Sequence, residues 1–136
     1  MSDTVECSKH FSRDELKCSF DPDAEVLMDV DFMEALEELR EEWGRPMRLS
    51  SAYRTENHPR ERTKPRKYDH LGNPLPIGGM HCRGRAIDCL IAGQDALEFL
   101  RVAVKYFNGI GINQKGDWDQ RFIHLDDRAT PAMWSY

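Results

Sequence analysis

The sequence predicts an α+β fold in which a small antiparallel sheet packs against two main helices. Two segments place apolar residues at the 3.6-residue spacing of an amphipathic helix, at residues 31–43 and 94–107. Short apolar segments bounded by Gly, Pro or polar turns are typical of strands, and they lie at residues 47–53, 85–91, 109–113 and 121–126. Because helices and strands are intermixed along the chain, we expect the α+β class.

The first main helix has a continuous apolar stripe and a charged opposite face. The stripe consists of Phe32, Met33, Leu36, Leu39 and Trp43. Five glutamates between residues 34 and 42 cover the side that we expect to face water. Gly44 and Pro46 follow the last turn and predict the end of the helix there.

The second main helix, over residues 94–107, lies between two strand-like segments. We expect its buried stripe to consist of Leu97, Leu100, Val104 and Phe107. A further short helical turn is expected after Ser12.

Residues 54–80 form a long segment rich in Arg, Lys, Pro, Asn and Gly with little apolar content. We expect a loop here, and loops of this length are uncommon unless they are functional or mobile. The segment joins two candidate site regions. We therefore expect residues 56–79 to be the most mobile part of the chain and to border the active cleft.

Length and composition predict one domain over residues 1–136. The net charge of −5 argues against general nucleic-acid binding, and no apolar run approaches the roughly 20 residues of a membrane span. The start MSDTVECSKHFSRDE has no apolar stretch, so we expect synthesis in the cytoplasm without a signal peptide. We also expect a monomer.

The four cysteines contain no CxxC pair, which argues against a structural zinc knot. Cytosolic synthesis favours free thiols. A pairing of Cys7 with Cys18 in an oxidising compartment is left open by the sequence.

Two predicted strands carry a polar residue among apolar neighbours, Asp88 in RAIDCLI and His124 in RFIHLD. A buried carboxylate or imidazole is costly unless it is paired or bound to a metal. His81 lies seven residues before Asp88, and a turn at Gly84 can bring both side chains to one point. Three protein ligands with one open position are typical of a catalytic zinc site.

At these residues the sequence resembles a known family. The stretch MHCRGRAID, residues 80–88, is similar to the His-x-x-Gly-x-Ala-x-Asp motif of zinc D-alanyl-D-alanine peptidases, the group related to the hedgehog signalling domain and to phage endolysin peptidases. SSAYRT, residues 50–55, resembles the Ser-x-Tyr-Arg segment of that family, and FIHLD resembles its last metal-histidine strand. The opening HFSRDELKC and the helix through EEWGRP also resemble phage-type members.

The resemblance implies a hedgehog-like or DD-peptidase-like fold with zinc held by His81, Asp88 and His124. It also implies that Arg54 binds a substrate carboxylate, for which the guanidinium fork is suited. Ser51 either supports the same pocket or is an ordinary strand serine.

The sequence departs from the family where the general base is concerned. Many relatives carry an acid three residues before the last metal histidine, and this chain has Arg121 there. Gly79 stands where a serine often precedes the first metal histidine. We consider Asp126 and Asp119 as the catalytic base, while Asp126 could equally orient an imidazole. His58 and His70 on the long loop are further candidates.

The resulting functional hypothesis is a zinc peptidase that hydrolyses peptidoglycan stem peptides, as a DD-carboxypeptidase or an endopeptidase. We expect it to be phage-encoded and to act at the cell wall after lysis or as a virion component. One alternative is a non-catalytic zinc-containing binding domain on the same scaffold. Another is a phage protein that regulates its host, with the acidic helix binding a partner.

Overall fold

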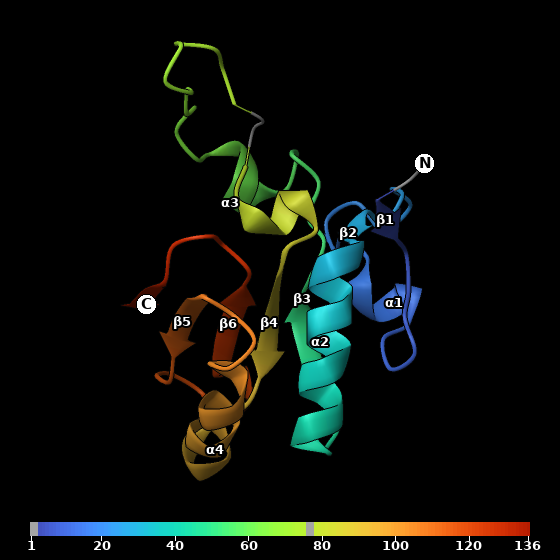
Figure 1. Ribbon diagram of the computed structural model, residues 1–136, viewed down its shortest axis with the longest axis vertical. Coiled ribbons are helices and arrows are strands. Elements are labelled where there is room, and N and C mark those ends of the chain that lie inside the picture. Colours follow the sequence, from blue (N-terminus) through green and yellow to red (C-terminus); the bar gives the residue numbers. More distant parts are fainter. Residues whose placement is uncertain (1–2, 76–77) are drawn as a thin grey trace.

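The computed structural model describes residues 3–75 and 78–136 and contains a five-stranded sheet of order β3-β4-β6-β5-β7 (Figure 1). The strands are β3 (Arg48–Ser51), β4 (Ala86–Leu90), β5 (Gly109–Asn113), β6 (Phe122–Asp126) and β7 (Ala132–Ser135). All neighbouring strands run antiparallel except β5 and β7, which are parallel. The sheet is therefore mixed at one edge.

Four α-helices accompany this sheet: α1 (Arg13–Leu16), α2 (Val30–Trp43), α3 (Pro59–Arg62) and α4 (Gly93–Ala103). Two short 3-10 helices, η1 (Met80–Arg83) and η2 (Trp118–Gln120), and a two-stranded ribbon of β1 (Thr4–Val5) and β2 (Met28–Asp29) complete the fold. Figure 1 shows the two long helices, α2 and α4, alongside the strands. This combination confirms the predicted α+β class with two main helices.

Local capping explains where the helices begin and end. The Asp29 side chain accepts a hydrogen bond from the Phe32 N–H at the start of α2, and Gly44 ends that helix in the left-handed conformation. Ser12 and Glu15 form a capping box at α1, where a short helical turn is predicted. The apolar face of α2 is buried as predicted through Phe32, Met33, Leu36 and Leu39.

The predicted buried stripe of the second main helix is correct at Phe107 and partly correct at Leu100, which packs half-buried against the core, but it is wrong at Leu97 and Val104. Its buried residues are Ala96, Phe99 and Ala103, with Phe107 buried beyond its end. Leu97 and Val104, expected in the core, are 52% and 54% exposed. The helical spacing was predicted correctly, but the prediction chose the larger aliphatic side chains as the buried ones. The helix instead turns its two alanines inward, where small side chains permit close packing.

Strands β4 and β6 divide their residues between two environments. Ile87 and Cys89 of β4, and Ile123 and Leu125 of β6, join the hydrophobic core with α2 and α4. Because successive side chains of a strand point to opposite faces, the alternate residues leave the core. Asp88 therefore lies on the face away from the helices, directly opposite His124 in the strand register.

Strands β1, β2 and β7 and helix α3 were not predicted. Strand β7 follows an irregular segment and pairs with β5, from which β6 separates it along the chain, while β1 and β2 are only two residues long each. Helix α3 forms one turn within the long segment that was expected to be a loop. Residues 76–77 of that segment lie outside the described residues.

The cysteines and the lengths of the helices agree with the expectations from composition. All four cysteines are free thiols, Cys7 and Cys18 included. Within residues 3–75 and 78–136, the structure contains no helix that is both long and apolar enough to cross a membrane.

The turn at Gly84 generates a stability prediction. Gly84 has φ of 67°, and a Cβ built there would lie 2.0 Å from the Leu27 carbonyl oxygen and 2.7 Å from the Met28 Cα. We expect Gly84→Ala to lower the free energy of unfolding by about 3–5 kcal/mol, because it combines left-handed strain with a backbone clash. Gly72→Ala is the matched control, since Gly72 has φ of 82° with nothing within 4 Å of a Cβ. It should cost only about 1–2 kcal/mol in urea unfolding. Equal losses for the two variants would contradict this packing role.

Candidate metal centre

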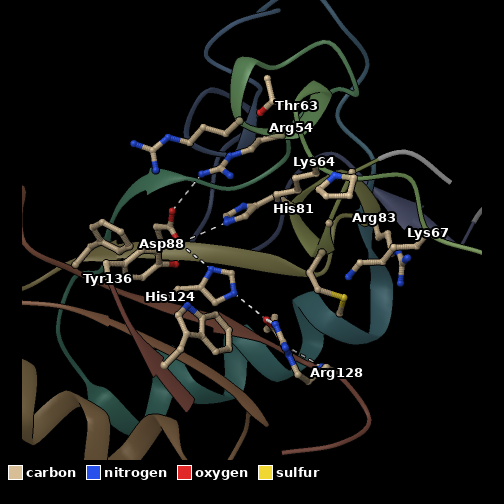
Figure 2. Close-up of a pocket in the computed structure, with 18 residues that line it drawn as sticks. Arg54, Thr63, Lys64, Lys67, His81, Arg83, Asp88, His124, Arg128 and Tyr136 are labelled. Carbon is tan, nitrogen blue, oxygen red and sulfur yellow. Dashed lines mark hydrogen bonds and ion pairs between the residues drawn. The ribbon is translucent and has the colours of Figure 1, made fainter. Parts of the chain in front are cut away.

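The three predicted metal ligands meet on the face of the sheet away from the core. Asp88 on β4 and His124 on β6 are direct partners across the strands, and the His124 Nδ1 atom lies 3.0 Å from Asp88 Oδ1. His81 is in η1, and its Nε2 atom lies 3.4 Å from the same carboxylate oxygen. One ligand atom from each residue lies within 4.8 Å of the others, and all three residues are buried. Figure 2 shows the side chains converging.

Each imidazole is oriented by a hydrogen bond to its second nitrogen. His81 Nδ1 lies 2.7 Å from the Ala52 carbonyl oxygen, which can only accept a hydrogen bond. His124 Nε2 lies 2.7 Å from Asp126 Oδ2. Partners of this kind fix the tautomer of metal-ligating histidines. They leave His81 Nε2 and His124 Nδ1 directed at Asp88, so the donor set fits a zinc ion.

The electrostatics of these residues follow from burial and pairing. Burial favours the neutral form of Asp88, but hydrogen bonds from His124 and His81 outweigh it and hold the pKa of Asp88 well below its usual value. Burial lowers the pKa of His81. Burial also acts to lower the pKa of His124, but its hydrogen bonds with Asp126 and Asp88 raise the pKa overall. Asp126 and Asp88 favour the protonated form of His124, so a metal ion that binds His124 would have to displace a proton.

Asp126 is completely buried and has a full set of hydrogen-bond donors. Its Oδ1 accepts from the Arg128 backbone N–H and Nε, at 3.1 and 2.8 Å, and its Oδ2 accepts from Arg128 Nη2 at 2.7 Å and from His124. Burial raises its pKa, but the bonds from Arg128 and His124 outweigh this and leave the pKa well below the usual value. Gly109 provides the room, because a Cβ there would lie 1.9 Å from Asp126 Oδ1. These contacts match the carboxylate that orients a ligand histidine.

Arg54 is 8% exposed and borders the metal centre, but its guanidinium is already engaged. Its Nε donates to Ser51 Oγ at 2.9 Å, its Nη1 to Glu61 Oε2 at 2.9 Å and its Nη2 to Asp88 Oδ2 at 3.3 Å. Ser51 thus supports Arg54 rather than lining the pocket itself. These contacts position Arg54 against the second oxygen of a predicted metal ligand.

Glu61 was not singled out from the sequence, although it is 0% exposed. Its carboxylate accepts from Arg54, from Lys64 Nζ at 3.0 and 3.1 Å, and from the Gly79 N–H at 2.7 Å. Burial acts to raise the pKa of Glu61, but these hydrogen bonds lower it to about 2. The signal in the sequence was its isolation, since it is the one acidic residue among the basic residues of NHPRERTKPRKY, residues 57–68.

The other candidates for a base lie outside this cluster. Asp119 is exposed in η2 and does not line the pocket beside the ligands. His58 begins α3, where its Nδ1 accepts a hydrogen bond from the Arg60 N–H, and His70 is exposed. The guanidinium of Arg121 donates to the Gly116 carbonyl oxygen and lies over the Trp118 ring.

Two aromatic residues near the C-terminus complete one wall, and the sequence reasoning gave them no role. The Trp134 ring lies 5.1 Å from the His124 ring, and the Arg128 guanidinium lies 4.5 Å from the Trp134 ring. Gly111 makes this possible, because a Cβ there would lie 2.7 Å from Trp134 Nε1. Tyr136 packs against Phe122 at 5.1 Å. Strand β7 and its neighbour β5, which contains Gly111, thus form part of the site.

The ligand cluster lies on the wall of a pocket of about 770 Å³ (Figure 2). One side is formed by α3 and the segments around it, including Thr63, Lys64 and Gly79, and the other by β6, β7 and Arg128. Residues of the long segment therefore border the pocket, as expected. The three ligands are accessible from a cavity large enough for a peptide segment.

The buried contacts of Glu61 predict a strong effect on stability. We expect Glu61→Gln to lower the free energy of unfolding by about 3 kcal/mol, because buried Arg54 then keeps only Asp88 as a charged partner and Lys64 loses its own. Urea unfolding at pH 7 measures the loss, and Glu38→Gln on the exposed face of α2 is the control. The pKa of about 2 in the folded protein lies below the usual value of 4.5 for a glutamate, so the stabilising contribution is complete above pH 4.5 and is lost as the pH falls toward 2. If the difference in free energy of unfolding between the unsubstituted protein and Glu61→Gln stayed constant down to pH 2, the negative charge of Glu61 would not contribute to stability.

The ligand geometry predicts one zinc ion per chain. Elemental analysis of protein purified with zinc should find about one equivalent, and His124→Ala should remove most of it, because two ligands hold zinc poorly. His70→Ala is the control and should keep the metal, since His70 is exposed and lies outside the cluster. Zinc affinity should fall with decreasing pH as His124 takes up its proton. Full zinc content in His124→Ala would exclude the site.

Comparison with known proteins agrees with this geometry. A family model described as Peptidase M15 matches residues 9–126, a span that includes Arg54, Glu61 and all three predicted ligands. No protein of curated function and no solved structure matches the chain. The family is one of metallopeptidases, which agrees with a cluster able to hold a metal ion. Because the match covers most of the sequence, the chain belongs to the peptidase M15 family.

Proposed function

We propose that the protein is a zinc-dependent peptidase that hydrolyses peptidoglycan stem peptides, as a DD-carboxypeptidase or an endopeptidase. The observation that carries this is the buried His81, Asp88 and His124 cluster on the wall of an open pocket in a member of the M15 family. The sequence resemblance to phage-type members supports an origin in a phage or prophage, with action at the cell wall after lysis or as a virion component.

A zinc ion held by these three residues would polarise the scissile carbonyl and lower the pKa of water toward about 7. The chain's own residues prepare the site for this. Ala52 holds the proton of His81 on Nδ1, and Asp126 holds a proton on His124 Nε2, so both ligand nitrogens stay directed at Asp88. Arg54 donates to the other Asp88 oxygen and holds that carboxylate in place.

Peptide hydrolysis also requires a group that takes a proton from the attacking water. Within the described residues, Asp126 is the one carboxylate besides Asp88 that lines the pocket, so we take it as the candidate for this role, to be tested against the orienting role that its bonds to Arg128 and to His124 Nε2 indicate. It would receive the proton on a carboxylate oxygen and pass it to the leaving amine. Trp134 packs on His124 and limits access of solvent to that side of the ligand.

A second candidate function is a zinc-containing binding domain without hydrolysis. Arg128 occupies both oxygens of Asp126 and keeps its pKa low, which makes this carboxylate a weak base. Arg121 stands where many relatives carry an acid, and its guanidinium is bonded to Gly116 instead. Release of peptides from purified peptidoglycan, with Asp88→Ala as the inactive control, separates the two functions.

The role of Asp126 has its own test. If Asp126 takes the proton, Asp126→Asn should keep about one zinc per chain and lower the rate of hydrolysis about a hundredfold or more. Zinc content and hydrolysis are measured on the same preparation, with Asp119→Asn as the control because Asp119 is exposed outside the pocket. Loss of zinc from Asp126→Asn would mean that Asp126 only orients His124. Loss of hydrolysis in Asp119→Asn with retention in Asp126→Asn would reverse the assignment.

A further inference from the structure

We propose that three cations to which the described residues offer no ion-pair partner, Arg60, Lys67 and Arg83, form an anion-binding rim that selects peptides carrying two or more free carboxylates near the cleaved bond. The inference rests on the proposed function in one respect, that a peptide occupies this pocket. It deepens that function by assigning the carboxylate recognition to residues other than Arg54.

Charge is distributed unevenly between the pocket and the rest of the protein. The net charge is −5, yet six of the 19 basic side chains line the pocket and only two of the 24 acidic ones do. The six are Arg54, Arg60, Lys64, Lys67, Arg83 and Arg128. A concave surface lined by one sign of charge concentrates ligands of the opposite sign. The pocket of this acidic protein therefore favours an anionic ligand.

Three of these cations are neutralised within the protein. Arg54 is bonded to Glu61 and Asp88, Lys64 to Glu61, and Arg128 to Asp126. Their charges hold carboxylates in place, and a ligand could recruit them only by breaking buried or half-buried ion pairs. Arg54 in particular would have to leave a predicted metal ligand in order to bind a substrate carboxylate.

The rim cations are arranged differently. Arg60, Lys67 and Arg83 are exposed, and within residues 3–75 and 78–136 none of them has an ion pair or a side-chain hydrogen bond. They come from three segments, α3, the chain that follows it and η1, and they meet at one pocket. Figure 2 draws Lys67 and Arg83 on one side of the view, away from Asp88. Separate segments that bring free cations to the same pocket favour a ligand with several negative charges.

The apolar residues of the same pocket favour a peptide as that ligand. Phe122, Trp134, Tyr136 and Met80 line the same cavity and offer apolar surface for side chains. A ligand with carboxylates on a partly apolar backbone matches both surfaces. A phosphate polymer would match only the charges.

The experiment compares two synthetic peptides that share one backbone, in which the scissile amide is replaced by a reduced amide. One carries three free carboxylates and the other carries the corresponding carboxamides. Fluorescence anisotropy of labelled peptides with the zinc-loaded protein should show about tenfold tighter binding of the carboxylate peptide at low salt, as expected from three exposed charge pairs. The preference should decrease at high salt.

The triple variant Arg60→Gln, Lys67→Gln, Arg83→Gln should bind both peptides equally. A matched control, Arg62→Gln, Arg66→Gln, Lys115→Gln, removes the same charges from exposed positions outside the pocket and should keep the preference. Equal binding of both peptides by the unsubstituted protein would overturn the inference, as would equal loss of preference in both variants. Inorganic polyphosphate that displaces the carboxylate peptide at a lower concentration than a carboxylate peptide competitor would overturn the choice of a peptide ligand.

Failure of the inference and failure of the proposed function give different results. A carboxylate preference without hydrolysis of the corresponding natural amides would support the rim and contradict the peptidase. Hydrolysis of the carboxylate and carboxamide peptides with equal kcat/KM would support the peptidase and contradict the rim. If the protein is a peptidase and the rim binds carboxylates, the triple variant Arg60→Gln, Lys67→Gln, Arg83→Gln should raise KM for the carboxylate peptide about tenfold and leave kcat unchanged. The reason is that the substitutions remove binding energy that the ground state and the transition state share.

Discussion

The pairing of Asp88 with His124 across β4 and β6 is the constraint on which the rest of the site depends. The two residues are direct partners in the register, and their neighbours Ile87, Ile123 and Leu125 are buried in the core on the opposite face. A shift of one residue in this register would move the apolar side chains out of the core and the ligands into it. The free energy of hydrophobic burial therefore fixes the relative position of two metal ligands. The third ligand, His81, reaches them because the chain turns at Gly84 against the backbone of residues 27–29.

Polar contacts attach the long segment over residues 54–80 to this sheet. Arg54 lies between Asp88 and Glu61, and Glu61 in turn binds the Gly79 N–H, two residues before His81. Every buried charge in this chain of contacts has an opposite charge beside it, which offsets the cost of removing it from water. These ion pairs and hydrogen bonds hold the segment in one position against the sheet, although it has few apolar side chains. It also explains why a segment of this length lies against the metal centre without a helix of more than one turn.

The sequence predicted those features that follow from local periodicity. Alternation in two strands predicted that Asp88 and His124 would lie among apolar neighbours, and helical spacing predicted α2. Features that depend on partners far along the chain were not predictable in this way. The burial of Glu61 depends on donors from three positions, and β7 exists through parallel pairing with β5. The face of α4 was misjudged because helical spacing fits two adjacent stripes equally well, and the packing space beneath the helix selects the alanine-containing one.

The cations around the pocket differ in whether they are paired, according to how deeply they are buried. A buried cation can be kept only with a partner, because an unpaired buried charge is costly, and this accounts for the pairing of Arg54. Arg128 is only half-buried, and its pairing holds the buried carboxylate of Asp126. A cation at the rim stays hydrated, so Arg60, Lys67 and Arg83 can do without a partner among the described residues at little cost to stability. Inner cations therefore contribute to structure by holding carboxylates, whereas outer cations are available to a ligand. The proposed rim places recognition of an anionic substrate with the outer cations, whereas the resemblance to the family implies Arg54, and only the second assignment requires buried ion pairs to break.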